Sequence, residues 1–326
     1  MTPDAVSGRV GEPVAEPHGA ALELAPRPAG HAFWRRLRAN RLALAGAVCL
    51  LGIVAFALLA PVVAAVTGHP VDTTYVETQL DEYGVPRGPS SSFLFGADQL
   101  GRDQLVRIAY GARTALLVGF LATAISLVIG LVIGIVSGFF GGIVDLLLSR
   151  VIDLFLVMPV LLLALGLSAS CGGAEGCAGG LIKPGLALVV AVIGLSNWAY
   201  VARVVRGQVL SIREREFIEA ARAFGGRPLR VLATEIVPNV ISSVIVLALI
   251  LFPSSILYEA ALAFLGIGVP RTASWGGTLA EAGKLLPAAW WMFVFPGLFL
   301  SVTVLSLSVL GEGVRDALDP REGANG

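Results

Sequence analysis

The chain has 326 residues, of which 56% are hydrophobic and 14% charged, and its mean hydropathy is +0.82. Ordinary soluble domains are about 45–50% apolar and about 25% charged, so this composition excludes a soluble globular protein and predicts an integral membrane protein. Basic and acidic residues balance at 23 each. That balance excludes the strongly basic surface of a typical nucleic-acid-binding protein.

Six stretches without Asp, Glu, Lys or Arg are long enough to cross a bilayer, which needs about 20 mostly apolar residues per helix. They are Leu42–Val71, Thr114–Val144, Leu154–Ala174, Pro184–Ala202, Ile236–Tyr258 and Leu285–Gly311. We therefore predict an all-α integral membrane domain of six transmembrane helices over residues 42–321. Residues 1–41 are polar and rich in Pro and Ala, which predicts a largely disordered cytoplasmic tail, and residues 322–326 form a short C-terminal tail.

The basic residues predict the orientation of these spans. If the N-terminus is inside, 16 basic residues lie in inner segments and 7 in outer segments, which together account for all 23. Cytoplasmic segments of membrane proteins carry the excess of Lys and Arg. The distribution therefore predicts that both termini are cytoplasmic.

Small and ionisable residues within the spans suggest packing faces and pathway positions. Gly130, Gly134, Gly138 and Gly142 recur at four-residue spacing in the second span, and such a face lets helices approach closely in lipid. Asp153 follows Arg150 by three residues, so the two are expected to neutralise each other along one helix face. Asp153 and Glu259 are candidate pathway or gate residues. Their alternative role is structural or interfacial, because both lie near a predicted membrane boundary.

The remaining polar chemistry is sparse. Cys171 and Cys177 flank a Gly-rich segment and would either close a disulfide in an oxidising compartment or remain free thiols. The three histidines, His18, His31 and His69, have no neighbours at metal-ligand spacing, so no metal site is predicted. No phosphate-binding Gly-x4-Gly-Lys-Ser/Thr loop is present, so we predict that the chain is not an enzyme and does not hydrolyse ATP itself.

The arginine-rich loop of residues 203–238 is the most informative segment. Ser211 and Glu214 have the spacing of a capping box, which predicts a helix over Ile212–Phe224. That helix would place four apolar residues on one side, Phe217, Ile218, Ala221 and Phe224. Gly225 and Gly226 would end it, and Pro228 would begin a second short helix. Physical reasoning leaves three roles open: a helix lying on anionic lipid, a solvated connector, or a docking element for a soluble partner. The alternating acids and arginines disfavour the first.

Three segments of the sequence resemble a known family. Glu219-Ala220-Ala221, followed by Gly225 and then by Glu235-Ile236-Val237-Pro238, is similar to the EAA loop of bacterial ABC importer permeases. The segment from Gly96 to Arg113 and the segment from Gly311 to Arg321 resemble those of the second permease of dipeptide, oligopeptide and nickel importers. Glu235 and Val237 depart from that subfamily's usual residues.

The resemblance implies a permease subunit of an ATP-binding-cassette importer that forms half of the pathway for peptides or a related small solute. The implied partners are a second homologous permease, two ATPase subunits that use ATP and Mg, an extracytoplasmic substrate-binding protein, and the lipid of the bacterial cytoplasmic membrane. A secondary carrier or channel is the alternative, although no central acid or inverted repeat supports it. A membrane-bound enzyme would need a catalytic constellation that the sequence lacks. The residues implied to couple transport to the ATPase are Arg213, Glu216, Phe217, Glu219, Ala220, Ala221, Phe224, Gly225 and Pro238.

Overall fold

The computed structural model describes residues 29–171, 185–269 and 272–318, and all regular secondary structure in these ranges is helical. The prediction of an all-helical membrane protein is confirmed. The helices are α1 (Ala29–Ala39), α2 (Arg41–Leu58), α3 (Ala60–Thr67), α4 (Val76–Gln79), α5 (Gln104–Phe140), α6 (Gly142–Val157), α7 (Val160–Cys171), α8 (Leu186–Arg213), α9 (Glu216–Ala223), α10 (Pro228–Val231), the π-helix η1 (Leu232–Ile236), α11 (Val237–Phe264), α12 (Trp275–Ala282) and α13 (Trp291–Leu318).

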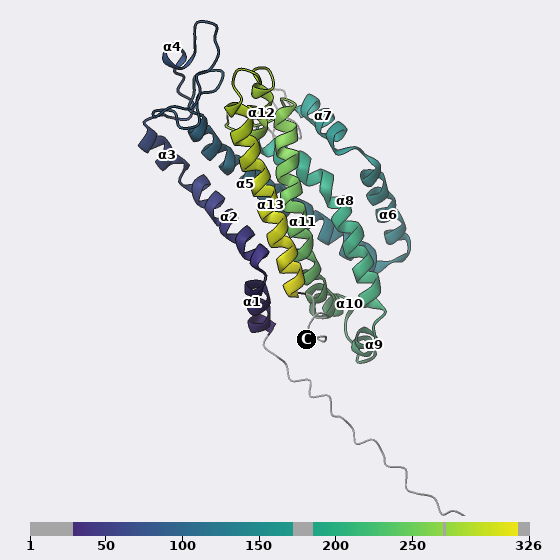
Figure 1. The fold of residues 1–326 in the computed structure, drawn as a ribbon. Helices are drawn as coiled ribbons and strands as arrows, with labels where there is room; N and C mark the ends of the chain where they lie inside the picture. The colour runs from purple at the N-terminus through teal and green to yellow at the C-terminus, as the bar shows by residue number, and fades with distance from the viewer. Residues whose placement is uncertain (1–28, 172–184, 270–271, 319–326) are drawn as a thin grey trace, which may run out of the picture.

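Five helical segments of the described chain are long and apolar enough to cross a membrane, and a sixth span is available if one bent pair is counted. The five are α2, α5, α8, the continuous segment Pro228–Phe264, and α13; the bent pair is α6 with α7. In Figure 1, α5, α8, α11 and α13 run side by side. The figure also places α2 on one flank, α6 and α7 on the opposite flank, and α9 and α10 at the end of the bundle away from α4 and α12.

The predicted spans need three corrections. The first apolar stretch, Leu42–Val71, is divided between α2 and α3, with Pro61 in the first turn of α3. The second span begins well before Thr114, because Asp103 caps α5 by accepting a hydrogen bond from the amide of Leu105. The third stretch is not a straight helix. It belongs to a pair that starts at Gly142 and bends by 91° between α6 and α7.

The bend between α6 and α7 follows from a proline. Pro159 lacks an amide hydrogen and cannot continue the hydrogen bonding of α6. The residue before a proline is also driven out of the helical region, and Met158 is extended with φ −71° and ψ 125°. The chain therefore leaves α6 at Met158 and restarts as α7.

Helices α5 and α8 pack closely along a face of glycines on α5. A Cβ added to Gly130 would lie 2.4 Å from Cβ of Val201, and one added to Gly134 would lie 2.7 Å from the carbonyl oxygen of Ala202. Gly138 is similarly close to Val209. Gly142 does not extend this face, contrary to our prediction, because α5 ends at Phe140 and Gly142 begins α6 with φ +55°.

Candidate functional site

The loop after α8 starts later than the capping-box spacing predicts. Ser211 and Ile212 lie within α8, which continues to Arg213, and Glu214 is its C-cap residue. The predicted helix start at Ser211 is therefore wrong. Ile212 is only 7% exposed and belongs to the same buried cluster as Val209, so tertiary packing extends α8 past the local capping signal.

Helix α9 is held to the bundle by a narrow apolar contact. Ile218 is fully buried in a cluster with Val231 and Ile236, and Ala221 packs against the same cluster. Phe217 and Phe224, which we predicted on the same apolar side, are instead 41% and 92% exposed. An eight-residue helix lying against the end of the bundle buries only a narrow stripe.

A tight turn closes α9 at the predicted glycines. Gly225 has φ +79°, a left-handed conformation that glycine adopts without steric cost. The amide of Gly226 donates to the carbonyl of Ala221 at 3.0 Å, and a Cβ at Gly226 would approach that oxygen to 2.6 Å. This hydrogen bond satisfies a carbonyl at the helix end and returns the chain to α10.

The remaining face of α9 is exposed. It carries Glu216, Phe217, Glu219 and Ala220, and the exposed Phe224 directly follows the helix. Beside it lies a pocket of about 630 Å³, which Phe224, Gly225, Arg230 and Glu235 help to line. An exposed aromatic side chain beside a charged pocket is an arrangement suited to a protein partner.

Two of the predicted coupling residues lie outside both α9 and the turn that follows it. Arg213 belongs to α8, and its Nη1 donates to the carbonyls of Gly138 and Phe139 at 3.3 and 3.2 Å. It therefore binds the C-terminal end of α5, where carbonyls have no helical partner. Pro238 is exposed in the first turn of α11.

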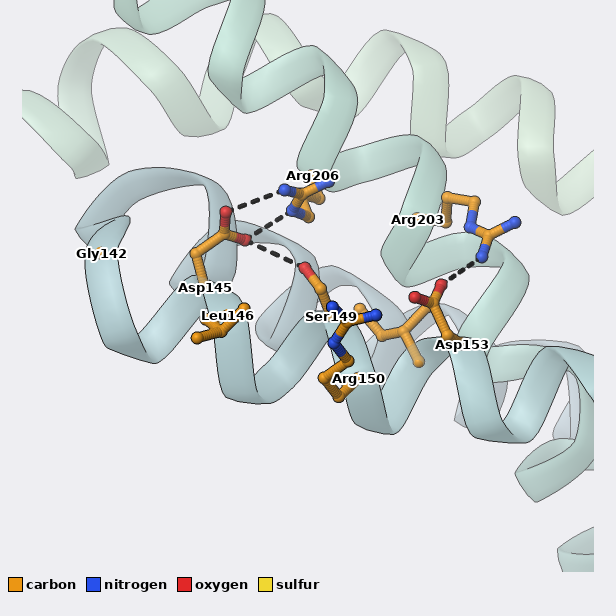
Figure 2. Close-up of a pocket in the computed structure, with 9 residues that line it drawn as sticks. Gly142, Asp145, Leu146, Ser149, Arg150, Asp153, Arg203 and Arg206 are labelled. Carbon is orange, nitrogen blue, oxygen red and sulfur yellow. Dashed lines mark hydrogen bonds and ion pairs between the residues drawn. The ribbon is translucent and has the colours of Figure 1, made fainter.

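A second pocket, of about 460 Å³, lies between α6 and α8 (Figure 2). Its main contact is Asp145, which accepts hydrogen bonds from Nε and Nη2 of Arg206 at 2.5 and 2.8 Å. Asp145 also accepts from Ser149 of its own helix and from Ser137 of α5. One carboxylate thus joins α5, α6 and α8. We did not single out Asp145 in the sequence, although it directly follows the long apolar stretch that ends at Val144.

Asp153 has a different partner from the one predicted. Its carboxylate forms an ion pair with Arg203 of α8, not with Arg150, and Figure 2 shows the two side chains meeting across the helices. The side chains of Asp153 and Arg203 remain 49% and 55% exposed. Sequence proximity favours Arg150, but the packing of α6 on α8 brings Arg203 to the carboxylate.

Glu259, the other candidate pathway acid, is 1% exposed and does not face an open space. Its Oε1 accepts a hydrogen bond from Ser274 Oγ at 2.8 Å, just before α12. The backbones are close here, because a Cβ on Gly276 would lie 2.0 Å from the carbonyl oxygen of Ala260. In this structure the hydrogen bond from Ser274 to Glu259 therefore links the start of α12 to α11.

The segment before α5 forms a compact charged clip, the name used here for Asp98, Arg102, Arg107 and Glu281. Asp98 is fully buried and accepts from the amides of Leu100 and Arg102 and from Arg102 Nε at 2.7 Å. Arg107 Nε lies 3.0 Å from the same carboxylate. Burial raises the pKa of Glu281, whose carboxylate lies 3.6 Å from Arg102, although the neighbouring arginines oppose that rise.

Aromatic side chains fix this clip to the bundle. Trp291 Nε1 donates to the carbonyl of Ala97 at 3.0 Å, and a Cβ on Gly96 would approach the Trp291 ring to 2.7 Å. His69 contacts Asp103 at 2.7 Å and stacks on Phe93. The motif from Gly96 onward thus has a structural role at the N-terminal end of α5.

The cysteine prediction falls partly outside the structure. Cys171 is 2% exposed at the end of α7, whereas Cys177 lies outside the described residues. Within the described ranges no group of three His, Cys, Asp or Glu side chains could hold a metal ion.

Comparison with protein families identifies the chain. Residues 130–323 match the model of the binding-protein-dependent transport system inner membrane component. Residues 30–83 match the N-terminal TM domain of oligopeptide transport permease C. The chain belongs to the binding-protein-dependent transport permeases. The family predicted from the sequence is confirmed.

Curated relatives of this permease cover nearly its whole length. The dipeptide transport system permease protein DppC of Bacillus subtilis (strain 168) is 36% identical over 88% of this chain and 84% of the relative. The oligopeptide transport system permease protein OppC of Escherichia coli (strain K12) is 37% identical over 90% of this chain and 93% of the relative. The di/tripeptide transport system permease protein DppC of Pseudomonas aeruginosa (strain UCBPP-PA14) is 37% identical over 89% of this chain and 91% of the relative.

A solved structure supports the fold of the permease. A chain of the MetNI methionine ABC transporter, in an inward-facing conformation, superposes with a TM-score of 0.54 at 19% identity and covers 65% of this chain and 97% of that chain. At this identity the likeness concerns the fold alone. The permease is thus a multi-pass membrane subunit with an ABC importer fold.

Proposed function

We propose that this permease forms half of the translocation pathway for dipeptides, oligopeptides or a related small solute. The proposal rests on the relatives, which are named as dipeptide, oligopeptide and di/tripeptide permeases. Its partners are a second homologous permease, two ATPase subunits that bind ATP and Mg, and an extracytoplasmic substrate-binding protein. Residues 42–321 form the membrane domain, between the N-terminal tail of residues 1–41 and the C-terminal tail of residues 322–326.

The observation that carries the coupling role is the division of α9 into one buried anchor and one exposed face. Ile218 fixes the helix to the bundle, while Glu219, Ala220 and Phe224 remain available to a partner. Small residues allow close docking, and the exposed acids disfavour a helix lying on anionic lipid. This arrangement supports a docking element over a solvated connector, which would need neither the anchor nor the exposed aromatic side chain.

In the proposed mechanism, nucleotide binding closes the ATPase pair and displaces α9 together with the ends of α8 and α11. The spans then switch between inward-open and outward-open packings. A nearly complete switch requires the partner to favour one state by about 5.5 kcal/mol. Because Arg213 binds the end of α5 and Asp145 joins α5, α6 and α8, displacement of α9 would reach three spans.

The test is reconstitution of the complex purified through a tag on this chain. We expect two ATPase subunits and a second permease to co-purify, and labelled di- to pentapeptides to accumulate in proteoliposomes only with ATP and the binding protein. Gly225→Ala places a side chain at φ +79°, whereas Gly207→Ala in α8 meets no atom within 4 Å in the described structure. The first variant should uncouple uptake from ATPase activity, and the second should not.

A charge reversal provides a second matched pair. Glu219→Lys on α9 should lower uptake and ATPase stimulation, while Glu214→Lys, at the exposed C-cap of α8, should change them little. Normal coupling in both Gly225→Ala and Glu219→Lys would refute the role of α9. Uptake driven by an ion gradient without ATP would instead establish a secondary carrier.

The proposed orientation places both termini in the cytoplasm of a bacterial cell, with this chain in the cytoplasmic membrane. In intact cells, a membrane-impermeant thiol reagent should label Arg87→Cys from outside and Arg227→Cys only after the membrane is opened. The opposite pattern would invert the topology. The same proposal puts Cys171 and Cys177 outside, where non-reduced peptides should show them linked; two free thiols would exclude the disulfide.

A further inference from the structure

The segment before the first span forms a short helix with a concentration of basic residues. Four arginines, Arg35, Arg36, Arg38 and Arg41, stand within seven consecutive residues, and residues 29–71 contain no Asp or Glu. Helix α1 carries the first three, and Arg41 begins α2. Figure 1 places α1 at the end of the bundle that also holds α9 and α10. The absence of acids distinguishes α1 from α9, whose first turn is acidic.

Helix α1 has one side against the bundle and one side exposed. Phe33 and Leu37 are partly buried, and α1 packs on α13 and α2. Trp34 is 58% exposed, and Arg35 and Arg38 are exposed as well. At about 100° per residue, these three exposed side chains fall within one sector of about 100°. The outward side of α1 therefore combines a large aromatic side chain with two cations.

The exposed cations are not neutralised within the described part of the chain. None of the ion pairs between described residues includes Arg35, Arg38 or Arg41. The exposed acids near the end of α13, Glu312 and Asp316, form no described ion pair with them either. The positive charge of this cluster is thus available to an anion from outside the chain.

The first span gives the depth of the cluster in the membrane. Leu42 starts an apolar stretch without charged residues that continues to Val71, so Arg41 lies at the edge of the hydrocarbon core. At 1.5 Å per residue, Arg38 and Arg35 lie about 5 and about 9 Å beyond Arg41. The polar layer on each side of the core is about 5–8 Å thick. The three guanidinium groups therefore reach the level of the lipid phosphates.

We propose that the outward side of α1 binds anionic phospholipid, with Arg35, Arg38 and Arg41 on the lipid phosphates and the indole of Trp34 in the headgroup layer. Basic residues and Trp together are typical of helices that lie in this layer, and basic clusters next to a span attract anionic headgroups. An acidic surface of an ATPase subunit would match the charge alone, whereas lipid matches the charge, the aromatic side chain and the depth. The inference goes beyond the proposed function and uses only its cytoplasmic placement of the N-terminus.

Hydrogen exchange in nanodiscs of defined composition tests this contact without depending on transport. The complete complex is placed in discs of phosphatidylcholine, which is zwitterionic, with or without the anionic lipid phosphatidylglycerol. One basic residue near an anionic surface strengthens binding about fivefold, so amides of residues 33–41 should exchange at least about tenfold more slowly in the anionic discs. At about 1 M salt, where the Debye length is about 3 Å, this difference should shrink.

A pair of charge-matched variants locates the contact. The triple variant Arg35→Gln, Arg38→Gln and Arg41→Gln should exchange equally fast in both kinds of disc. The control removes three exposed cations from segments other than α1 and α2, so that the change in net charge is the same. Its substitutions are Arg87→Gln, Arg113→Gln and Lys284→Gln. The control should keep the lipid dependence of the parent.

The outcomes separate lipid from the other partners of α1. Equal exchange of α1 in both kinds of disc would overturn the proposal for the parent complex. Protection that does not depend on phosphatidylglycerol, and that disappears when the ATPase subunits are removed, would assign α1 to the ATPase and refute lipid binding. Lipid-dependent protection in a complex that transports no peptide would support the contact and count only against the proposed substrate.

Discussion

The burial of Ile218 leads to a prediction about how α9 is held in place. Replacing a fully buried Ile by Ala costs about 2–5 kcal/mol, from lost apolar burial and from the cavity left behind. Since 1.4 kcal/mol corresponds to about tenfold in an equilibrium, Ile218→Ala should reduce the ratio of docked to undocked α9 by roughly 30-fold or more. The effect should be local, because Ile218 is the fully buried side chain of α9 among those described.

An undocked α9 should also unfold. The helix has eight residues, whereas isolated helices shorter than about 12–15 residues are marginal in water. Hydrogen-exchange mass spectrometry on peptides covering residues 216–223 should therefore show faster exchange in Ile218→Ala than in the parent permease. Exchange in α5 and α8 should change little.

Phe224→Ala is the matched control. Phe224 is 92% exposed, so its truncation should leave exchange in α9 unchanged while weakening co-purification of the ATPase subunits. Unchanged exchange in Ile218→Ala would show that the apolar contact does not hold the helix. Equal exchange increases in both variants would refute the division of α9 into an anchor and a docking face.

Three other substitutions test the packing and the charges. Gly134→Val should lower the thermal unfolding midpoint, since even a Cβ would meet the backbone of α8 at 2.7 Å; Gly52→Val on α2, with no described atom within 4 Å, should change it little. Asp145→Asn should destabilise the permease by about 1.5–3 kcal/mol through its lost charged hydrogen bonds, and more than Asp153→Asn, whose pair is about half exposed; equal losses would contradict this ranking. Because burial raises the pKa of Glu281 in the native state, its contribution to stability is present below the ordinary carboxyl pKa of 4.5 and is lost as pH rises through the native value. Glu281→Gln should remove this loss, so the thermal unfolding midpoint of the variant should fall less than that of the parent between pH 4.5 and 8. If the midpoints of the two proteins change with pH in parallel, the buried Glu281 carboxyl does not contribute to the pH dependence of stability.

Much of the fold follows from local features of the sequence. Continuous apolar stretches predict membrane helices because the backbone must satisfy its own hydrogen bonds in lipid. Gly225 and Gly226 mark the end of α9 because few other residues adopt the left-handed turn found there. The motif around Glu219 carries the family resemblance that the comparisons confirm. Each of these signals lies within a short segment, so no knowledge of distant contacts is needed.

Contacts between distant segments had to come from the tertiary structure. The partner of Asp153 is Arg203 and not its sequence neighbour Arg150, because α6 packs on α8. Asp145 gains its role only where α5, α6 and α8 meet. In this structure the buried Glu259 carboxylate accepts a hydrogen bond from Ser274 at the start of α12, so it holds α12 against α11 and is not exposed.

The sequence by itself therefore determined the membrane class, the helical character of the apolar stretches and the glycine turn after α9. The tertiary structure decided where α8 ends, which way the phenylalanines of α9 face, and which charges pair. The physical reason is that helix formation in lipid and left-handed turns depend on a few consecutive residues, whereas ion pairs and buried anchors depend on which helices pack together. In this permease the burial of Ile218 and the ion pairs between α6 and α8 are both products of that packing.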